Sequence, residues 1–249
     1  MNANEGDSTG LVPVETFDPC AFVPDENHSP ALCAFVLTLA AIYNDFKNIM
    51  LADHLLEKQR PPGSPAETAA WGEYNGFRSY LVRVLAGLFH ELLGVVSRNK
   101  SVLSDRAFTE AVKHIPKSSR ESWQAIADAA FTQPSQSDVT RSLLLARNKV
   151  IFHYDCKEIL KGYNLRFADP NQPSAPYISR GNTMQSTRFH FADAAAQAYL
   201  RQCLETQDIH KEYGPASPLI TQVNLALHEI VLTFIQRRGC PWRSVPLRT

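Results

Sequence analysis

Apolar residues recur at helical spacing over most of the chain, and prolines and glycines mark where this pattern stops. The segments with this spacing, which we expect to be helices, are residues 30–59, 66–98, 105–114, 118–131, 137–160, 191–211 and 219–238. The helix over 137–160 has Ser137 or Asp138 as its N-cap and is expected to end near Gly162 as a C-cap. Short extended pieces at 163–167 and 188–191 allow a short hairpin near 163–191.

The pattern predicts an all-α fold, a single-domain up-and-down bundle of about six or seven helices. Residues 1–30 carry several prolines and little periodicity, which predicts an irregular N-terminal arm. We expect the helical domain to cover 31–240 and a C-terminal tail to cover 241–249.

Composition is that of an ordinary globular protein, with 44% hydrophobic and 20% charged residues. The 25 Lys and Arg balance the 25 Asp and Glu, so any contact with RNA must be a local patch. The five cysteines are widely spaced and contain no Cys-x-x-Cys pair, which favours reduced thiols. The chain begins without a basic signal-peptide region, and its longest apolar run, Ala31 to Tyr43, is too short to span a bilayer. We therefore expect a cytoplasmic protein with no membrane partner.

Metal and cofactor motifs are incomplete in this sequence. His90-Glu91 and His228-Glu229 begin as zinc-protease helices do, but Gly94 and Leu232 stand where the second histidine is needed. The glycines form no Walker or dinucleotide pattern, and no serine lies in Gly-x-Ser-x-Gly. We therefore expect no metal site and no cofactor.

The segment Arg147 to Asp155 carries the most chemistry. Arg147 is followed by Asn148, and His153 comes six positions after the arginine. A permanent cation and a side chain that titrates near neutrality are what metal-free phosphodiester cleavage needs. Six helical residues leave two side chains about 120° apart, so a second copy of the helix would help to complete a phosphate site.

Neighbouring residues suit the same chemistry. Lys149 lies four positions before His153 and Lys157 four after it, so on one continuous helix all three share a face. Two cations would lower the pKa of the histidine and help to hold a phosphate. Tyr154 lies nearly in line with the arginine and can stack on a base, and Asp155 can orient a side chain or face solvent. The candidate catalytic residues are therefore Arg147, Asn148 and His153, and the candidate substrate-binding residues are Lys149, Tyr154 and Lys157.

This segment resembles the HEPN superfamily, whose signature is an arginine, a polar residue and then a histidine after four to six positions. The resemblance covers residues 137 to 162, and residues 181 to 193 have a weaker similarity. It implies an all-helical dimer and a metal-independent endoribonuclease acting in stress response, phage defence or a toxin–antitoxin system. HEPN toxins paired with minimal nucleotidyltransferases carry His-x-Tyr, whereas Tyr154 directly follows His153 here. Regulation by nucleotide transfer to this tyrosine is therefore not expected.

Several functions fit these residues. The first is the endoribonuclease, with RNA as substrate, a homodimer through the motif helix, and an antitoxin or regulatory protein as further partner. The second is a non-catalytic HEPN-like dimer that binds a nucleotide, RNA or a protein partner, which the neutral net charge favours. The third is a small-molecule enzyme that uses His190 or Glu229 in an interhelical pocket. Alternatively, Arg147 and His153 form a buried polar network, with the arginine paired to a carboxylate such as those of Glu73, Glu91 or Asp155.

Overall fold

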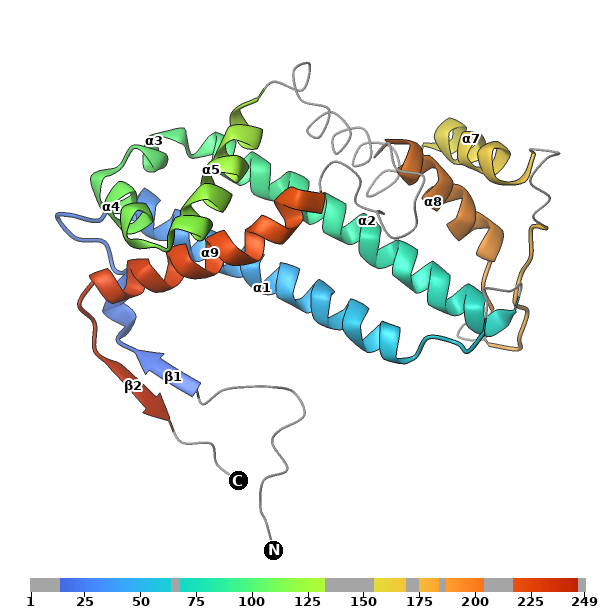
Figure 1. The fold of residues 1–249 in the computed structure, drawn as a ribbon, viewed down its shortest axis with the longest axis horizontal. Helices are drawn as coiled ribbons and strands as arrows, with labels where there is room; N and C mark the ends of the chain where they lie inside the picture. Colours follow the sequence, from blue (N-terminus) through green and yellow to red (C-terminus); the bar gives the residue numbers. More distant parts are fainter. Residues whose placement is uncertain are drawn as a thin grey trace, which may run out of the picture.

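The structure, a computed structural model, describes residues 14–63, 68–132, 155–168, 175–183, 187–203 and 217–245. Within these residues the chain is an all-α bundle with one small sheet (Figure 1). In chain order the elements are β1 (Val14–Phe17), the 3-10 helix η1 (Pro19–Phe22), α1 (Pro30–Lys58), α2 (Ala69–Arg98), α3 (Lys100–Leu103), α4 (Arg106–His114), α5 (Lys117–Phe131), α7 (Cys156–Phe167), α8 (His190–Cys203), α9 (Ser217–Arg237) and β2 (Trp242–Val245).

Helices α1 and α2 are the long elements of the bundle and lie side by side (Figure 1). The Ser29 hydroxyl accepts a hydrogen bond from the Leu32 backbone N–H, and Pro30 occupies the first helical position, as helix starts favour. The Thr68 hydroxyl accepts from the Trp71 N–H and starts α2 in the same way. Both helices were predicted, with boundaries that differ from the structure by at most a few residues.

Helix α9 closes the core at the left of Figure 1, where it packs against α1, α4 and α5. Its apolar stripe was predicted to face the core, and this is confirmed. The buried residues of this stripe are Val223, Ala226, Leu227, Ile230, Phe234 and Ile235. Helices α4 and α5 were also predicted, and Asp105 caps α4 by accepting hydrogen bonds from the backbone N–H groups of Ala107 and Phe108.

Helices α7 and α8 form a separate layer at the other end of the bundle, with α8 on α2 and α7 on α8 (Figure 1). Residues 163–167 were predicted to be extended, but they belong to α7. The extended piece expected at 163–167 is therefore wrong. Of the short hairpin considered near 163–191, the described residues show one antiparallel bridge, between Ser179 and Arg188. The predicted helix over 191–211 begins at His190 as α8, and residues 204–211 lie outside the described residues.

The N-terminal arm and the C-terminal tail pair with each other. Strands β1 and β2 are antiparallel, from Val14 opposite Val245 to Phe17 opposite Trp242. An arm without regular structure was expected, so this part of the prediction is wrong. The pairing partners are far apart in the sequence, and no local pattern indicates them.

Helices α1 and α2 are long and apolar enough to cross a membrane, by length and composition alone. Of the most apolar window of each, 44% in α1 and 61% in α2 is buried inside the protein. Core helices of soluble proteins have the same properties. The run Ala31 to Tyr43 lies inside α1 and contributes buried residues to the core, as predicted. The cytoplasmic location stays a prediction.

The packing of α9 gives a stability prediction. Leu227 has no exposed surface, whereas Leu225 on the same helix is 48% exposed. Leu227→Ala leaves a cavity and is expected to lower the free energy of unfolding by about 2–5 kcal/mol. Leu225→Ala is the matched control and is expected to change it by at most about 0.5 kcal/mol. Urea unfolding followed by circular dichroism measures both, and equal effects of the two substitutions would contradict this packing.

Candidate functional site

Most of the predicted site lies outside the described residues. Arg147, Asn148, Lys149, His153 and Tyr154 all fall in the segment 133–154, which the structure does not describe. Lys157 is described and lies exposed in the first turn of α7. That these residues come together therefore stays a prediction. The structure describes the elements that follow them in the chain, beginning with Asp155 and α7.

Asp155 ends the motif segment and starts α7. Its backbone is extended, with φ −76° and ψ 112°, and its carboxylate accepts a hydrogen bond of 3.0 Å from the Lys157 N–H. Aspartate is a preferred N-cap because it satisfies an amide that has no helical partner. The prediction of one helix from 137 to 160 is therefore wrong: α7 begins at Cys156 and ends at Phe167, beyond Gly162. The argument that Lys157 shares a helical face with His153 fails for the same reason.

Gly162 lies in the middle of α7 and allows it to approach α8 closely. A Cβ atom at this position would lie 2.1 Å from the backbone oxygen of Ala195. Any larger residue must therefore push the two helix backbones apart. Gly162 was predicted to be a C-cap, but it is a buried contact inside the helix.

A cavity of about 560 Å³ lies beside this contact. Its wall is mostly apolar and includes Ile159 and Tyr163 from α7 and Phe191 from α8. Its charged lining residues are Arg83 and Asp193, whose side chains approach to 3.9 Å. Cys156, three residues after His153, also lines it, so the cavity lies next to the C-terminal end of the motif segment.

Arg188 joins the segment before α8 to α2. Its Nε donates to Asp193 at 2.8 Å and its Nη1 donates to Glu73 at 2.8 Å. The guanidinium lies over Gly76, where a Cβ atom would come within 2.4 Å of it. Glu73 was one carboxylate considered as a partner of Arg147, and here it accepts a hydrogen bond from Arg188.

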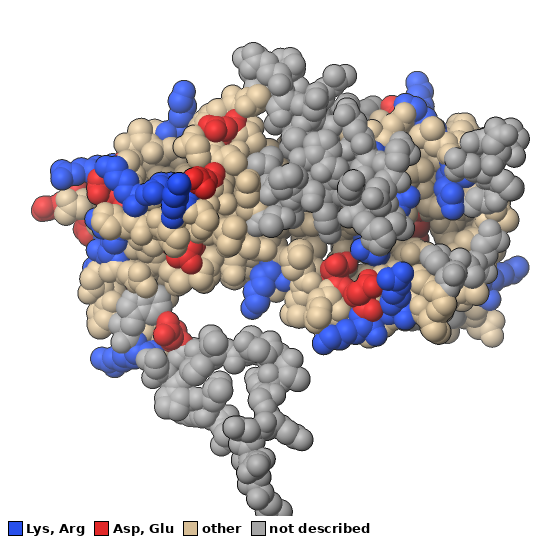
Figure 2. Space-filling model, in the orientation of Figure 1, with Lys and Arg blue, Asp and Glu red and all other residues tan. Residues whose placement is uncertain are grey.

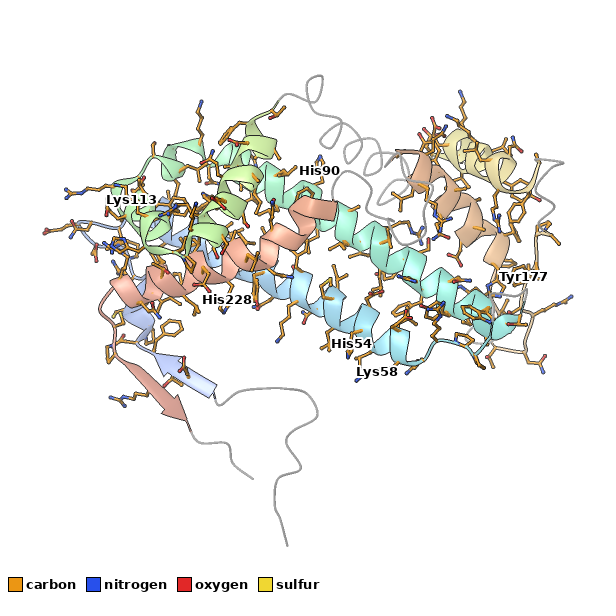
Figure 3. All side chains as sticks on the ribbon, viewed as in Figure 1. His54, Lys58, His90, Lys113, Tyr177 and His228 are labelled. Atoms are coloured by element: carbon orange, nitrogen blue, oxygen red, sulfur yellow. The ribbon has the colours of Figure 1, made fainter. Side chains whose placement is uncertain are left out.

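His190 packs one turn further toward the start of α2. A Cβ atom at Gly72 would lie 2.2 Å from its ring, and the Tyr177 ring stacks on it at 4.7 Å (Tyr177 is labelled in Figure 3). Its Nε2 lies 2.6 Å from the Ser179 hydroxyl. Burial lowers the pKa of His190, which favours the neutral ring. With 4% of its surface exposed, and outside the lining of the cavity, His190 is placed to anchor α8 rather than to meet a substrate.

Sequence reasoning missed the role of Gly72 and Gly76. They lie four residues apart on one face of α2, and a pair of glycines at that spacing marks a place where another segment approaches closely. The segment 187–193 that fills this place was expected to contain a short extended piece and the start of a helix, and was not expected to contact α2.

The histidines considered as metal ligands lie on separate elements (Figure 3). His90 lies 3.8 Å from the carboxylate of Glu91, and His228 lies 3.1 Å from that of Glu229. In the part of the chain that the structure describes, no group of three His, Cys, Asp or Glu side chains is arranged to hold a metal ion.

Comparisons with known proteins add no relative. No protein-family model, no curated protein and no solved structure matches this chain.

The surroundings of His190 predict a pH dependence. Because its pKa is lower in the folded protein than in the unfolded chain (about 6.5), the unfolded chain binds more protons as the pH falls. The contribution of the buried, neutral His190 to the free energy of unfolding is complete above the pKa of the unfolded chain. It is lost as the pH falls below that pKa. We therefore expect the thermal unfolding midpoint to fall more steeply from about pH 7.5 to about pH 5 in wild type than in His190→Gln. Differential scanning calorimetry measures this midpoint.

The exposed His54 gives the control His54→Gln, in which the midpoint should still fall as steeply as in wild type. Equal slopes for wild type and His190→Gln would contradict this assignment.

Proposed function

We propose that the protein is a metal-independent endoribonuclease of HEPN type. The observation that carries this proposal is the string Arg147-Asn148 followed by His153-Tyr154, immediately before the Asp155 cap of α7. The all-α architecture agrees with it. A role in stress response, phage defence or a toxin–antitoxin system follows from the resemblance alone.

In the proposed reaction, His153 takes the proton from a ribose 2′-hydroxyl, and the oxygen attacks the adjacent phosphorus. The bond from phosphorus to the 5′-oxygen of the next nucleotide breaks, and that oxygen receives a proton from water or from a protonated histidine. The products are a 2′,3′-cyclic phosphate and a 5′-hydroxyl. Arg147 stabilises the charge on the phosphoryl oxygens, and Asn148 holds the arginine or the phosphate by hydrogen bonds.

Local charge next to the motif supports contact with RNA despite a net charge of zero. Helix α7 carries three basic residues, Lys157, Lys161 and Arg166, and one acidic residue, Glu158. Over the rest of the face in Figure 2, basic and acidic side chains lie close together. Because phosphate contacts need only a local positive field, Lys157 remains a candidate phosphate contact, together with Lys149 and Tyr154.

The cavity between α7 and α8 offers a place for an unstacked base. Tyr163 and Phe191 stand in its wall and pack edge to face, with ring centroids 6.4 Å apart, so a base would stack on the cavity side of one ring and not between the two. Proteins that read single-stranded RNA stack splayed bases on such aromatic side chains. This favours single-stranded or loop RNA as the substrate class.

A non-catalytic HEPN-like dimer is the second candidate. The equal numbers of basic and acidic residues favour it, because the whole chain has no positive excess to attract RNA. Such a dimer would bind a nucleotide, an RNA or a protein partner, such as an antitoxin or regulator, through the same polar segment.

The ribonuclease proposal predicts RNA cleavage in excess EDTA. Purified protein is expected to cut single-stranded or loop RNA and to leave a 2′,3′-cyclic phosphate. Arg147→Ala and His153→Ala are each expected to lower the rate at least about 10²-fold, since both act on the same transition state. Lys149→Ala should lower it less, through phosphate affinity. Gel electrophoresis of labelled RNA, with mass spectrometry of the ends, measures both rate and product.

Two controls separate this activity from a contaminating nuclease. His54→Ala removes an exposed histidine from α1 and is expected to cut as wild type does. A substrate with deoxyribose at the cleavage site should not be cut, because it lacks the attacking hydroxyl. If His153→Ala cuts as well as wild type, or if wild type leaves a mixed cellular RNA pool uncut, the enzyme proposal is wrong.

We further expect a homodimer in which each phosphate site takes residues from both copies. Sedimentation should then give twice the chain mass at micromolar concentration. Co-refolded Arg147→Ala and His153→Ala chains should regain cleavage that neither variant has alone, because one of the two sites in a mixed dimer keeps both residues. A strict monomer, or no recovery in verified mixed dimers, would contradict the composite site.

A further inference from the structure

The thiols of Cys20 and Cys240 meet where the N-terminal arm touches the end of α9. Their Sγ atoms lie 3.1 Å apart, although 220 positions separate them in the sequence. Cys20 belongs to η1 and is exposed, whereas Cys240 follows α9 and is buried. Both are free thiols.

The backbone on either side of this thiol pair is held by other contacts. Strands β1 and β2 pair just outside it, with Phe17 opposite Trp242. Arg238 donates hydrogen bonds to the Cys20 carbonyl at 2.9 Å, to the Val23 carbonyl and to the Asp25 carboxylate. The two chain ends therefore reach this place whether or not the sulfurs are bonded.

Packing beneath the pair fixes Cys240 in particular. Cys240 forms a small apolar cluster with Ala21 and Ile235, all of them buried. Gly239 has φ 66°, a left-handed conformation that glycine adopts at little cost, and turns the chain out of α9 toward β2. A disulfide has an S–S length of about 2.05 Å, so closing the bond requires the sulfurs to approach by only about 1 Å.

We propose that Cys20 and Cys240 are a redox modification site, at which a low-molecular-weight disulfide converts the two thiols into one reversible intramolecular disulfide. This inference does not rest on the proposed ribonuclease function.

The reaction is two thiol–disulfide exchanges. The thiolate of Cys20, the exposed residue of the pair, attacks oxidised glutathione, forms a mixed disulfide and releases one glutathione. The Cys240 sulfur then attacks the Cys20 sulfur and releases the second glutathione. Two protein thiols are oxidised, one glutathione disulfide is reduced to two thiols, and a dithiol reductant reverses both steps.

The reduced pair is protected from fast reaction. The hydrogen bond with Cys240 and then that with Asp18 raise the pKa of the Cys20 thiol to about 12, so little thiolate is present at neutral pH. Disulfide formation is therefore expected to be slow and to accelerate as the pH rises. The disulfide is therefore expected to form only when oxidising conditions last, and Cys20 is not expected to act as a catalytic thiol.

The test uses the full chain, reduced, freed of reductant and then incubated with oxidised glutathione. Thiol titration is expected to show the loss of two of the five thiols, and mass spectrometry of a non-reducing digest should show one Cys20–Cys240 cross-linked peptide. The thermal unfolding midpoint should rise on the order of 5–15 °C, because the bond closes a very long loop. Dithiothreitol should reverse both changes.

Matched variants identify the sulfurs. Cys20→Ser replaces an exposed residue and should abolish the cross-link and the rise in midpoint while leaving the reduced midpoint unchanged. Cys240→Ser should abolish the cross-link as well. Cys156→Ser removes the exposed thiol on α7, at the other end of the bundle, and should keep both effects (Figure 1). A Cys20–glutathione adduct that persists, a disulfide between two chains, or five titratable thiols after oxidation at raised pH would each overturn the proposal.

Discussion

Helix α2 must be buried on most of its surface, and the positions of the other helices depend on this. It packs against α1, α5 and α8, and its buried residues run from Trp71 in the first turn to Val96 in the last. Full burial of each large apolar side chain contributes about 1.5–3 kcal/mol, so an uncovered side of α2 would be costly. Helix α1 lies alongside α2, and at one end α5 adds to the cover (Figure 1). At the other end α8 supplies it, and this is why a second layer exists there.

The second layer is held to the first by polar contacts that need small residues. Gly72 and Gly76 leave room on α2 for His190 and Arg188, and Glu73 between them accepts a hydrogen bond from the arginine. These contacts fix the start of α8. Helix α7 in turn packs on α8, because Gly162 lets the backbones of these two helices come into contact. The place where the motif segment enters α7 therefore depends on α2 through two successive glycine contacts.

Sequence patterns located the elements whose signals are local. Proline and cap residues set the start of α1, and the buried stripe of α9 follows from its spacing alone. Contacts between distant segments were missed because no local signal encodes them, as with β1 and β2 or with Arg188 and Glu73. Asp155 was misassigned for another reason. An aspartate after a helical stretch fits both a helix interior and a cap, and only the extended backbone decides between them.

The candidate site could be predicted only as far as its residue types. The Arg147 and His153 pair is a property of the sequence, and its geometry lies outside the described residues. What the structure adds is the cap at Asp155, which separates Lys157 from the helical face it was expected to share with His153. Of the expected neighbours, Lys157 is therefore the one whose role in phosphate binding must rest on the charge of α7 and not on helical spacing.

The proposed thiol site and helix α7 lie at opposite ends of the bundle (Figure 1). Helices α1 and α2 are each about 45 Å long and packed side by side, so the pairing of β1 with β2 is remote from α7 (Figure 1). A bond between Cys20 and Cys240 ties chain ends that other contacts already hold, and so it acts on the unfolding equilibrium. The positions of α8 and α7 depend instead on the contacts of Gly162, Arg188 and His190. The proposed RNA cleavage is therefore expected to respond to changes at the α7 end, and not to the bond between Cys20 and Cys240.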